Sequence, residues 1–256
     1  MRKKGVGLEL YFLGTGNAFA QGRAYGSFLM DGRILFEVPP TALPTLRQDG
    51  FDLRRIDVVF ISHFHADHCF GLPFLFLDHF FITKRKTPLT IVGPKGIERL
   101  AGDLVDLGFP GTRKSYGANF PVEFIEVVPG RSYSAKGIAF KAMRMFHGDQ
   151  PDIGYRVEYK GRTIAYSGDT GPCRGLDKLL KGAHIGILEM SSLDGDFASH
   201  MNRQNIWDVL RSSGGATTLV LTHLPNLTQE EKDSITHNPF GVVEIAEDHQ
   251  RLKLAL

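Results

Sequence analysis

The sequence predicts an α/β fold, and three observations support this class. Short apolar runs typical of buried strands recur along the chain, and helix-like segments lie between many of them. The length of 256 residues, with 42% hydrophobic and 23% charged residues, is that of an ordinary globular protein with a large core. Histidine and aspartate residues follow several expected strands, at the edge where sites form in layered α/β folds. We therefore expect one domain, residues 1–256.

Composition and charge exclude several classes of protein. The net charge of +2 is too close to zero to indicate a nucleic-acid partner by itself. The two cysteines, Cys69 and Cys173, form no CxxC pattern, so a secreted disulfide framework is not indicated. No apolar signal core follows the basic residues 1–4, and no apolar run is long enough to span a membrane. We expect a cytoplasmic protein with no membrane partner.

In the first half of the chain, apolar runs predict strands over residues 8–13, 27–30, 33–37, 56–61 and 90–92. The second and third form a hairpin, because Asp31-Gly32 between them is a strong signal for a two-residue turn. Helices are expected over residues 42–48, 70–82 and 97–107. Gly50 ends the first of these helices. Residues 108–121 are rich in glycine, proline and basic side chains and are expected to form a surface loop.

In the second half, strands are expected over residues 124–128, 138–146, 155–159, 163–166, 185–188 and 217–221. Lys160-Gly161 joins the third and fourth of these in a hairpin. Helices are expected over residues 176–180 and 202–213, and Gly214 lies just beyond the end of the second. The tail, residues 242–256, has β character and gives no sign of a separate domain.

Three histidines and one aspartate lie within six positions, directly after the expected strand 56–61. They are His63, His65, Asp67 and His68. Imidazole nitrogens and carboxylate oxygens are the ligands that suit Zn²⁺ and related cations. A loop of this kind can direct the first two side chains to one side and the last two to another, so it can serve two metals. Cys69, the next residue, is either a further ligand or a small buried packing residue, and packing is favoured.

Three further strand ends carry residues of the same type, namely His147, Asp169 and His223. Alone, Asp169 would be a turn former in Gly-Asp-Thr. Beside the histidines it can bridge two cations, because its two oxygens can bind different metals. The sequence therefore predicts a metal site to which four strand ends contribute.

The histidine-rich run 63–68, together with His147, Asp169 and His223, resembles the HxHxDH pattern of the metallo-β-lactamase superfamily. The similarity covers nearly the whole chain. Within the superfamily it is closest to the ribonuclease Z and phosphodiesterase branch, in the segments Phe12-Leu-Gly-Thr-Gly16, Val92-Gly-Pro-Lys-Gly-Ile97, Ile187-Leu-Glu189 and Leu221-Thr-His223. The resemblance implies a four-layer αββα sandwich with the metal site at its edge.

The resemblance also implies two zinc ions per chain, with manganese as the alternative. Carried over by position, one metal is expected to take the ligands His63, His65, His147 and Asp169. The other is expected to take Asp67, His68, Asp169 and His223. His200 falls where this branch keeps a catalytic histidine that binds no metal, so we expect His200, together with Asp67, to be catalytic.

The chain departs from ribonuclease Z in two places. That family inserts a long arm that holds tRNA between the positions matching His147 and Asp169, where this chain has only a short hairpin. Residues 36–40, Phe-Glu-Val-Pro-Pro, replace the family's acidic, glycine-rich turn. Armless relatives of this kind, including the anti-Pycsar phosphodiesterases of phages, act on small phosphodiesters such as cyclic nucleotides. The expected substrate is therefore a small nucleotide phosphodiester, with RNA as an alternative.

The chemistry that follows is attack on phosphorus by a hydroxide that bridges two metals, whose charge lowers the pKa of the water toward roughly 7. The leaving group is a sugar alkoxide, so a general acid helps, and His200 is the candidate. Glu189 is either a hydrogen-bond partner of His200 or of a ligand, or an ordinary carboxylate at a strand end.

Three other functions remain open. One is a ribonuclease Z-like endoribonuclease that acts on tRNA or other RNA. Another is a lactone or thioester hydrolase, because the same set of metal ligands serves those reactions. A protein that binds metal or nucleotide without catalysis is disfavoured, since all seven ligand positions are intact.

The expected helix 70–82 has Asp78 and His79 as its only polar side chains. A helix that lies on a sheet needs only one apolar stripe, so the outer face should expose several aromatic rings. Such a patch indicates an interface unless the 108–121 segment covers it. Ribonuclease Z relatives resemble this arrangement in pairing through the helix after their histidine loop. We therefore expect a two-fold homodimer through residues 70–82.

Overall fold

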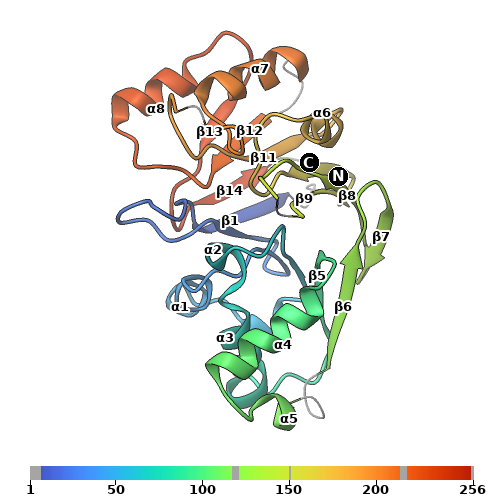
Figure 1. Cartoon of the computed structure of the whole chain (residues 1–256). Helices are drawn as coiled ribbons and strands as arrows, with labels where there is room; N and C mark the ends of the chain where they lie inside the picture. Colours follow the sequence, from blue (N-terminus) through green and yellow to red (C-terminus); the bar gives the residue numbers. More distant parts are fainter. Residues whose placement is uncertain (1–6, 117–120, 150, 196, 214–217, 255–256) are drawn as a thin grey trace, which may run out of the picture.

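Two β-sheets pack face to face, and helices cover the outer face of each (Figure 1). The structure is a computed structural model that describes residues 7–116, 121–149, 151–195, 197–213 and 218–254. Among these residues each sheet has seven strands. This arrangement is the predicted four-layer αββα sandwich.

The first sheet has the strand order β14-β1-β2-β3-β4-β5-β6. Its strands are β1 Leu8–Gly14, β2 Ser27–Met30, β3 Ile34–Phe36, β4 Val58–Phe60, β5 Leu89–Pro94, β6 Val122–Val127 and β14 Arg251–Leu254. The helices in this half are α1 Ala42–Gln48, η1 Leu53–Arg55, α2 Ala66–Cys69, α3 Leu72–Leu77, η2 Asp78–Ile82, α4 Ile97–Gly108 and α5 Arg113–Tyr116.

The second sheet has the strand order β13-β12-β11-β10-β9-β8-β7. Its strands are β7 Ser132–Ala135, β8 Ile138–Arg144, β9 Ile153–Tyr159, β10 Arg162–Tyr166, β11 Ile185–Glu189, β12 Thr218–Thr222 and β13 Val243–Ile245. The helices in this half are α6 Arg174–Leu180, α7 Arg203–Ser213 and α8 Gln229–Thr236. No helix of the described part of the chain is long and apolar enough to cross a membrane.

The alternation of side chains along each strand builds three apolar layers. In β1, Leu10 and Phe12 point into the core between the sheets, whereas Tyr11 and Leu13 point toward α1 and its neighbours. Because both faces of the central strands are buried, these strands are apolar throughout. The middle core is rich in aromatic rings, each of which stabilises the fold by roughly 1.5–3 kcal/mol through burial.

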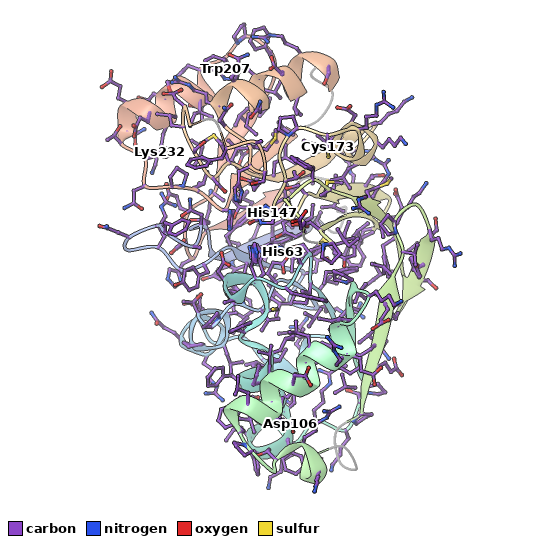
Figure 2. The ribbon with its side chains drawn as sticks, in the orientation of Figure 1. His63, Asp106, His147, Cys173, Trp207 and Lys232 are labelled. Carbon is purple, nitrogen blue, oxygen red and sulfur yellow. The ribbon has the colours of Figure 1, made fainter. Side chains whose placement is uncertain are left out.

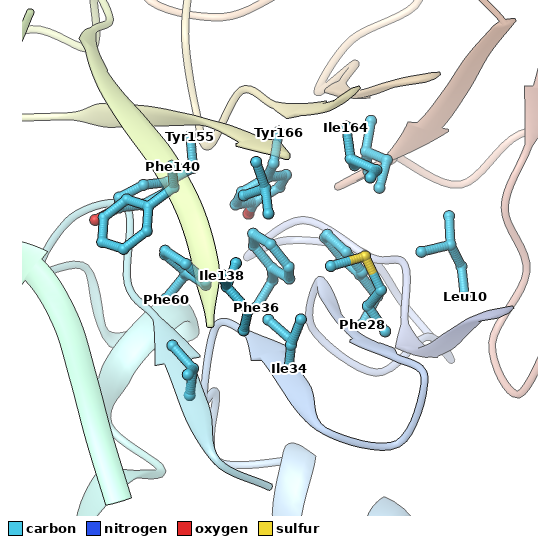
Figure 3. Packing of buried hydrophobic residues seen from close by; sticks show 14 of the residues in the cluster. Leu10, Phe28, Ile34, Phe36, Phe60, Ile138, Phe140, Tyr155, Ile164 and Tyr166 are labelled. Atoms are coloured by element: carbon cyan, nitrogen blue, oxygen red, sulfur yellow. The ribbon is translucent and has the colours of Figure 1, made fainter. Parts of the chain in front are cut away.

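Aromatic side chains of the two sheets meet in this middle core (Figure 3). Phe28, Phe36 and Phe60 stack along the first sheet, with ring centroids 4.4 and 4.9 Å apart in successive pairs. Tyr166 of the second sheet meets Phe36 edge-on at 5.3 Å. Tyr155 donates a hydrogen bond of 2.7 Å to the carbonyl of Ile61, which fixes the backbone just before the histidine-rich run.

The sheet topology brings the predicted strand ends together. Strands β10, β11 and β12 run parallel, so their carboxyl ends lie at one edge of the second sheet. Asp169 follows β10, and His223 follows β12. In the first sheet β3, β4 and β5 are parallel, and the histidine-rich run follows β4. Figure 2 shows His63 and His147 near the middle of the molecule, where the two halves meet.

Several predicted elements are correct because local signals determine them. Asp31 and Gly32 have φ values of 50° and 66°, which are those of the expected tight turn, although Arg33 adds a third residue between β2 and β3. Lys160 and Gly161 form a two-residue turn between β9 and β10, with φ values of 50° and 73°. Helix α1 ends one residue before Asp49, and Gly50 follows with φ of 75°.

The expected helix over residues 70–82 is present from Leu72 to Ile82, but it begins two residues late and its last turn is a π-helix. Helix α2 ends at Cys69, a new helix α3 begins after Gly71, and residues 78–82 form a turn of π-helix. Gly71 packs so closely on the preceding segment that a Cβ there would lie 2.3 Å from the carbonyl oxygen of Pro39. Only glycine therefore fits at this position between α2 and α3. The wide π turn buries Asp78 and His79, and Asp78 pairs with Arg47.

Other boundaries also differ from the prediction. The expected loop 108–121 contains the short helix α5, and residues 117–120 lie outside the described part. Strand β7 and helix α8 were not predicted, and the tail divides, with β13 in the second sheet and β14 in the first. Strand β8 ends three residues before His147. Residue 217, where a strand was expected to begin, and Gly214 are also outside the described residues.

Candidate metal centre

All seven residues predicted as metal ligands lie together at the edge of the sandwich. One group consists of His63, His65, His147 and Asp169, and a second consists of Asp67, His68 and His223. Within each group the candidate ligand atoms lie within 4.8 Å of one another. A third group with candidate ligand atoms within 4.8 Å of one another consists of Asp169, His200 and His223.

The carboxylate of Asp169 lies between the two groups. Its Oδ2 is 3.9 Å from Nε2 of His63 and 3.9 Å from Nε2 of His147. The same oxygen is 3.5 Å from Nε2 of His223, and Oδ1 is 3.4 Å from Nε2 of His68. One carboxylate therefore faces imidazoles of both groups, which is the geometry that two neighbouring cations require.

The donor atoms of this centre fit a bound cation. Nε2 of His63, Nε2 of His68 and Oδ1 of Asp169 are buried and have no hydrogen-bond partner among the described residues. Buried polar atoms without partners are rare in folded proteins and indicate a ligand that completes them. Imidazole nitrogen and carboxylate oxygen are the donor set of zinc and related metals.

The local fold explains why the short run 63–68 can serve both groups. Strand β4 ends at Phe60, and His65 is the residue that caps helix α2. Asp67 and His68 therefore lie in the first turn of that helix, rotated away from the two histidines before it.

The turn that carries Asp169 packs tightly against this run. Gly168 has φ of 62°, and a Cβ there would lie 2.6 Å from Cβ of Ser62. Only glycine accepts both the left-handed backbone and the close approach. This contact sets the position of Asp169 relative to His63.

Each buried histidine has a second partner at Nδ1, on the side away from Asp169. Nδ1 of His63 is hydrogen-bonded to Ser62 Oγ at 2.9 Å and lies 3.3 Å from Oδ2 of Asp152, and Nδ1 of His68 lies 3.6 Å from Oε2 of Glu37. Outer neighbours on the Nδ1 side leave Nε2 of each imidazole free to bind a metal, and here Ser62 makes the hydrogen bond while the two carboxylates are ion-pair neighbours.

Glu37 and Asp152 were not predicted as site residues. Both are fully buried, and Glu37 has φ of 61°, which is rare for a residue other than glycine. The Glu37 carboxylate accepts hydrogen bonds from the backbone N–H of Ser62 at 3.1 Å and from Tyr166 Oη at 3.0 Å. The one available signal in the sequence was that a charged residue directly follows the apolar strand 33–36.

The electrostatics of the centre favour added positive charge. Burial lowers the pKa of His63 well below its ordinary value, which keeps the ring neutral and able to bind a metal. Burial opposes the charged form of His68 too, but the carboxylates of Asp169 and Glu37 outweigh it and raise that pKa well above the usual range. Burial, together with the charge of Asp169, raises the pKa of Asp152 well above its usual range. The carboxylates of Asp169, Glu37 and Asp152 lie near one another, and cations bound between them would offset their charge.

His200 is part of a chain of hydrogen-bonding side chains that leads through Glu189 and Ser191 to His223. Its Nδ1 lies 2.7 Å from Oε1 of Glu189. Oε2 of Glu189 accepts a hydrogen bond of 2.7 Å from Ser191 Oγ, which in turn lies 2.9 Å from Nδ1 of His223. Burial alone would lower the pKa of His200, but the hydrogen bond to Glu189 and the charges of Glu189 and Asp169 together outweigh it and raise the pKa above the ordinary value. The interpretation of Glu189 as a partner of His200 is confirmed by this geometry.

A pocket of about 520 Å³ lies over the centre. Its wall includes Asp67, Asp169 and His200, and its rim includes Phe19 and Phe197, which are 92% and 63% exposed. A pocket of this size accommodates a small ligand such as one nucleotide.

Cys69 is a packing residue, as favoured by its sequence context. It is fully buried and is not a member of either ligand group among the described residues. Its Sγ donates a weak hydrogen bond to the carbonyl of His65, and burial raises its pKa to about 12. The thiolate that a metal requires is therefore disfavoured.

Comparison with known proteins gives one matching family model and many relatives. Residues 8–206 match the model of the anti-Pycsar protein Apyc1. Ribonuclease Z of Staphylococcus epidermidis is 26% identical over 261 residues, which cover 81% of this chain and 83% of that protein.

Solved structures share the fold. The metallo-β-lactamase fold protein YhfI from Bacillus subtilis superposes with a TM-score of 0.76 at 20% identity, over 96% of this chain and 99% of that one. The short form of human tRNase Z superposes with a TM-score of 0.75 at 24% identity, over 97% of this chain and 100% of that one.

Proposed function

This chain belongs to the family of the anti-Pycsar protein Apyc1, within the metallo-β-lactamase superfamily, and from that premise we propose that it is a dinuclear-zinc phosphodiesterase for small or cyclic nucleotides. Its assignment as a metal-dependent hydrolase follows from its relatives. The reaction on a phosphodiester and the number and identity of the metals are the parts that we propose.

The observation that carries the proposal is the position of Asp169 between two groups of ligand-type side chains. One metal would be held by His63, His65, His147 and Asp169. The second would be held by Asp67, His68, His223 and the same Asp169. Manganese remains the alternative metal, because these donors also suit it.

Bound cations supply a nucleophile at neutral pH and stabilise charge on the phosphoryl oxygens. The residues of the chain hold these cations, orient the ligands and donate a proton. Asp169 and Asp67 hold the centre together, while Asp152 and Glu37 keep the imidazoles oriented. His200 faces the pocket with its Nδ1 bonded to Glu189, so that its Nε2 can give a proton to the departing alkoxide.

The size of the pocket favours a small substrate over folded RNA. Its volume of about 520 Å³ matches one nucleotide, and the interval between His147 and Asp169 contains only β9 and β10 with their connections. The chain thus lacks an extended arm there, among the residues described, to grip a tRNA. A ribonuclease activity is the second function, supported by the similarity to ribonuclease Z.

A substrate panel tests the proposal directly. The panel contains 2′,3′- and 3′,5′-cyclic nucleotides, bis-p-nitrophenyl phosphate, a pre-tRNA and a lactone, each assayed with zinc and with manganese. We expect a cyclic nucleotide or the aryl diester to turn over faster than pre-tRNA under matched conditions. Site-selective cleavage of pre-tRNA at a higher rate would instead establish the ribonuclease, and hydrolysis of the lactone alone would establish acyl chemistry.

The protein also has a surface suited to pairing with a second copy. Phe74 and Phe81 are 46% and 53% exposed, and Ile82 is 69% exposed, on the outer side of α3 and η2. Phe109 covers part of Phe74, with ring centroids 5.6 Å apart. Because an exposed aromatic patch of this kind marks an interface, we expect a two-fold homodimer through residues 70–82.

Sedimentation at micromolar concentration should report the dimer mass for the native protein and the monomer mass for Phe81→Asp. The control is Val242→Asp, since Val242 is similarly exposed, at 57%, but lies next to β13 in the other half. It should remain dimeric. Two results would contradict pairing through this surface. The native protein could be a monomer, or Phe81→Asp and Val242→Asp could dissociate the dimer equally.

A further inference from the structure

A second hollow, of about 820 Å³, lies beside helix α6 and strands β8 and β9. Its lining has six cationic side chains, those of Lys141, Arg144, Arg156, Arg174, Lys178 and Lys181. No carboxylate is among the lining residues that the structure describes. We call this hollow the basic groove. The whole chain has a net charge of only +2, so the groove is a local concentration of positive charge.

The charges in the groove are poorly neutralised by the protein. Lys141, Arg144, Arg174, Lys178 and Lys181 have no acidic side chain within 4.0 Å in the described parts of the chain. Arg156 is the exception, with Nε 3.6 Å from Glu158. Positive side chains so close together repel one another, and a bound anion would relieve this repulsion.

The backbone places like charges side by side. Lys141 on β8 lies directly opposite Arg156 on β9 in the antiparallel register, where like charges are destabilising. Arg174 and Lys178 are four residues apart on α6, so they share one face of the helix, with the same effect. Three elements thus direct cations into one hollow.

The helix is fixed closely against the sheet beneath it. A Cβ at Gly175 would lie 1.8 Å from the carbonyl oxygen of Arg144, so α6 contacts the backbone at the end of β8. Arg156 donates hydrogen bonds of 2.9 Å to the carbonyls of Leu179 and Lys181, at the end of the same helix. The cations of the groove are therefore carried by a rigid frame.

Only a thin wall separates the groove from the metal centre. Phe146, which is 45% exposed, lines the groove, and the next residue, His147, lines the pocket over the metals. The N–H of Gly171 donates a hydrogen bond of 2.8 Å to the carbonyl of Phe146.

We propose that the basic groove binds the phosphate backbone of a single-stranded nucleic acid, with a base stacked on Phe146. Grooves lined with cations and exposed aromatic rings are how proteins hold single strands without regard to sequence. The strand passes from the groove toward the metal centre, but its binding does not depend on the reaction proposed there.

The test is fluorescence anisotropy with a labelled strand of about 12 nucleotides, as RNA and as DNA, and the metal-loaded native protein. The strand is checked on a gel after each titration to show that it is intact. Each phosphate contact with a single strand gives a salt slope of about −0.7, which corresponds to roughly fivefold in affinity at about 0.1 M salt. The double change Arg174→Glu with Lys178→Glu should therefore weaken binding roughly 25-fold and make the salt slope shallower by about 1.4.

The matched control is Arg55→Glu with Lys114→Glu, which changes the net charge equally at two exposed cations outside the groove. It should weaken binding by less than about threefold, since it leaves the phosphate contacts intact. Both doubles should hydrolyse bis-p-nitrophenyl phosphate at the native rate. Phe146→Leu should weaken binding with no change in salt slope, because stacking is lost and the charges remain.

Three results would overturn the proposal. They are equal losses with the two double variants, no binding of either strand by the native protein, or binding of a poly-glutamate peptide as tight as that of the strands. The last result would assign the groove to acidic proteins. Since binding is measured without turnover, an absence of phosphodiesterase activity would refute the proposed reaction and leave this inference intact. RNA bound more tightly than DNA would identify RNA as the physiological strand.

Discussion

Replacing Asp169 with alanine should remove both metals and nearly all activity. The native protein should contain about two metal ions per chain, because the residues form two groups that share this carboxylate. Without Asp169, each group loses a ligand and the negative charge that offsets neighbouring cations. The rate should fall by at least the roughly 10²–10³-fold that loss of one transition-state-stabilising group costs. Elemental analysis and the rate on bis-p-nitrophenyl phosphate measure the two effects.

A control is needed, because Asp169 is buried and its loss can destabilise the fold. Asp177→Ala removes an exposed aspartate from α6 and should keep both metals and full activity. Asp169→Asn keeps the shape of the side chain but loses its charge, and it should also lose metal while retaining the native circular dichroism spectrum. Native protein without bound metal, with activity that chelators leave unchanged, would contradict the two-metal centre altogether.

The candidate ligands were predictable from sequence because each follows a strand whose apolar run is easy to identify. His223 after β12 and Asp169 after β10 needed only the rule that parallel strand ends gather at one edge. The turn at Asp31-Gly32 was predictable for a different reason, since its backbone conformation depends on two residues alone. Signals of both kinds are local in the sequence.

Features that depend on distant contacts were missed or wrong. The π turn at residues 78–82 departs from the α-helix expected there, and it buries Asp78, which pairs with the distant Arg47. Glu37 and Asp152 are orienting partners only because the fold buries them beside His68 and His63. In the sequence each is a single acidic residue beside an apolar run, and burial of such a residue is the exception.

The same limit applies to the basic groove. Its six cations come from β8, β9, α6 and the residue that caps the end of α6, and they are dispersed along the sequence among residues that do not line the groove. A near-neutral total charge therefore gave no indication of a nucleic-acid surface. The cross-strand register of Lys141 and Arg156 brings the charges together, and register is a property of the folded sheet.

His200→Ala should distinguish a proton donor from a metal ligand. His200 keeps its Nδ1 against Glu189, and this bond raises the pKa of the ring, so that more of the enzyme carries the imidazolium at neutral pH. A proton from His200 matters most when the leaving group is a poor one. We therefore expect a rate loss of roughly 10²–10⁴-fold for a cyclic nucleotide, whose leaving group is an alkoxide.

For bis-p-nitrophenyl phosphate the same variant should lose much less, because p-nitrophenolate leaves without protonation. Metal content should remain about two per chain, which a role as ligand would not allow. The paired control is His237→Ala, at an exposed histidine that ends helix α8, and it should leave both rates unchanged. Glu189→Gln should reproduce part of the alkoxide-specific defect, since the weaker bond no longer holds the imidazolium. Equal losses on the two substrates, or loss of one metal with His200→Ala, would show that His200 serves the centre as a ligand or in positioning and not as the acid.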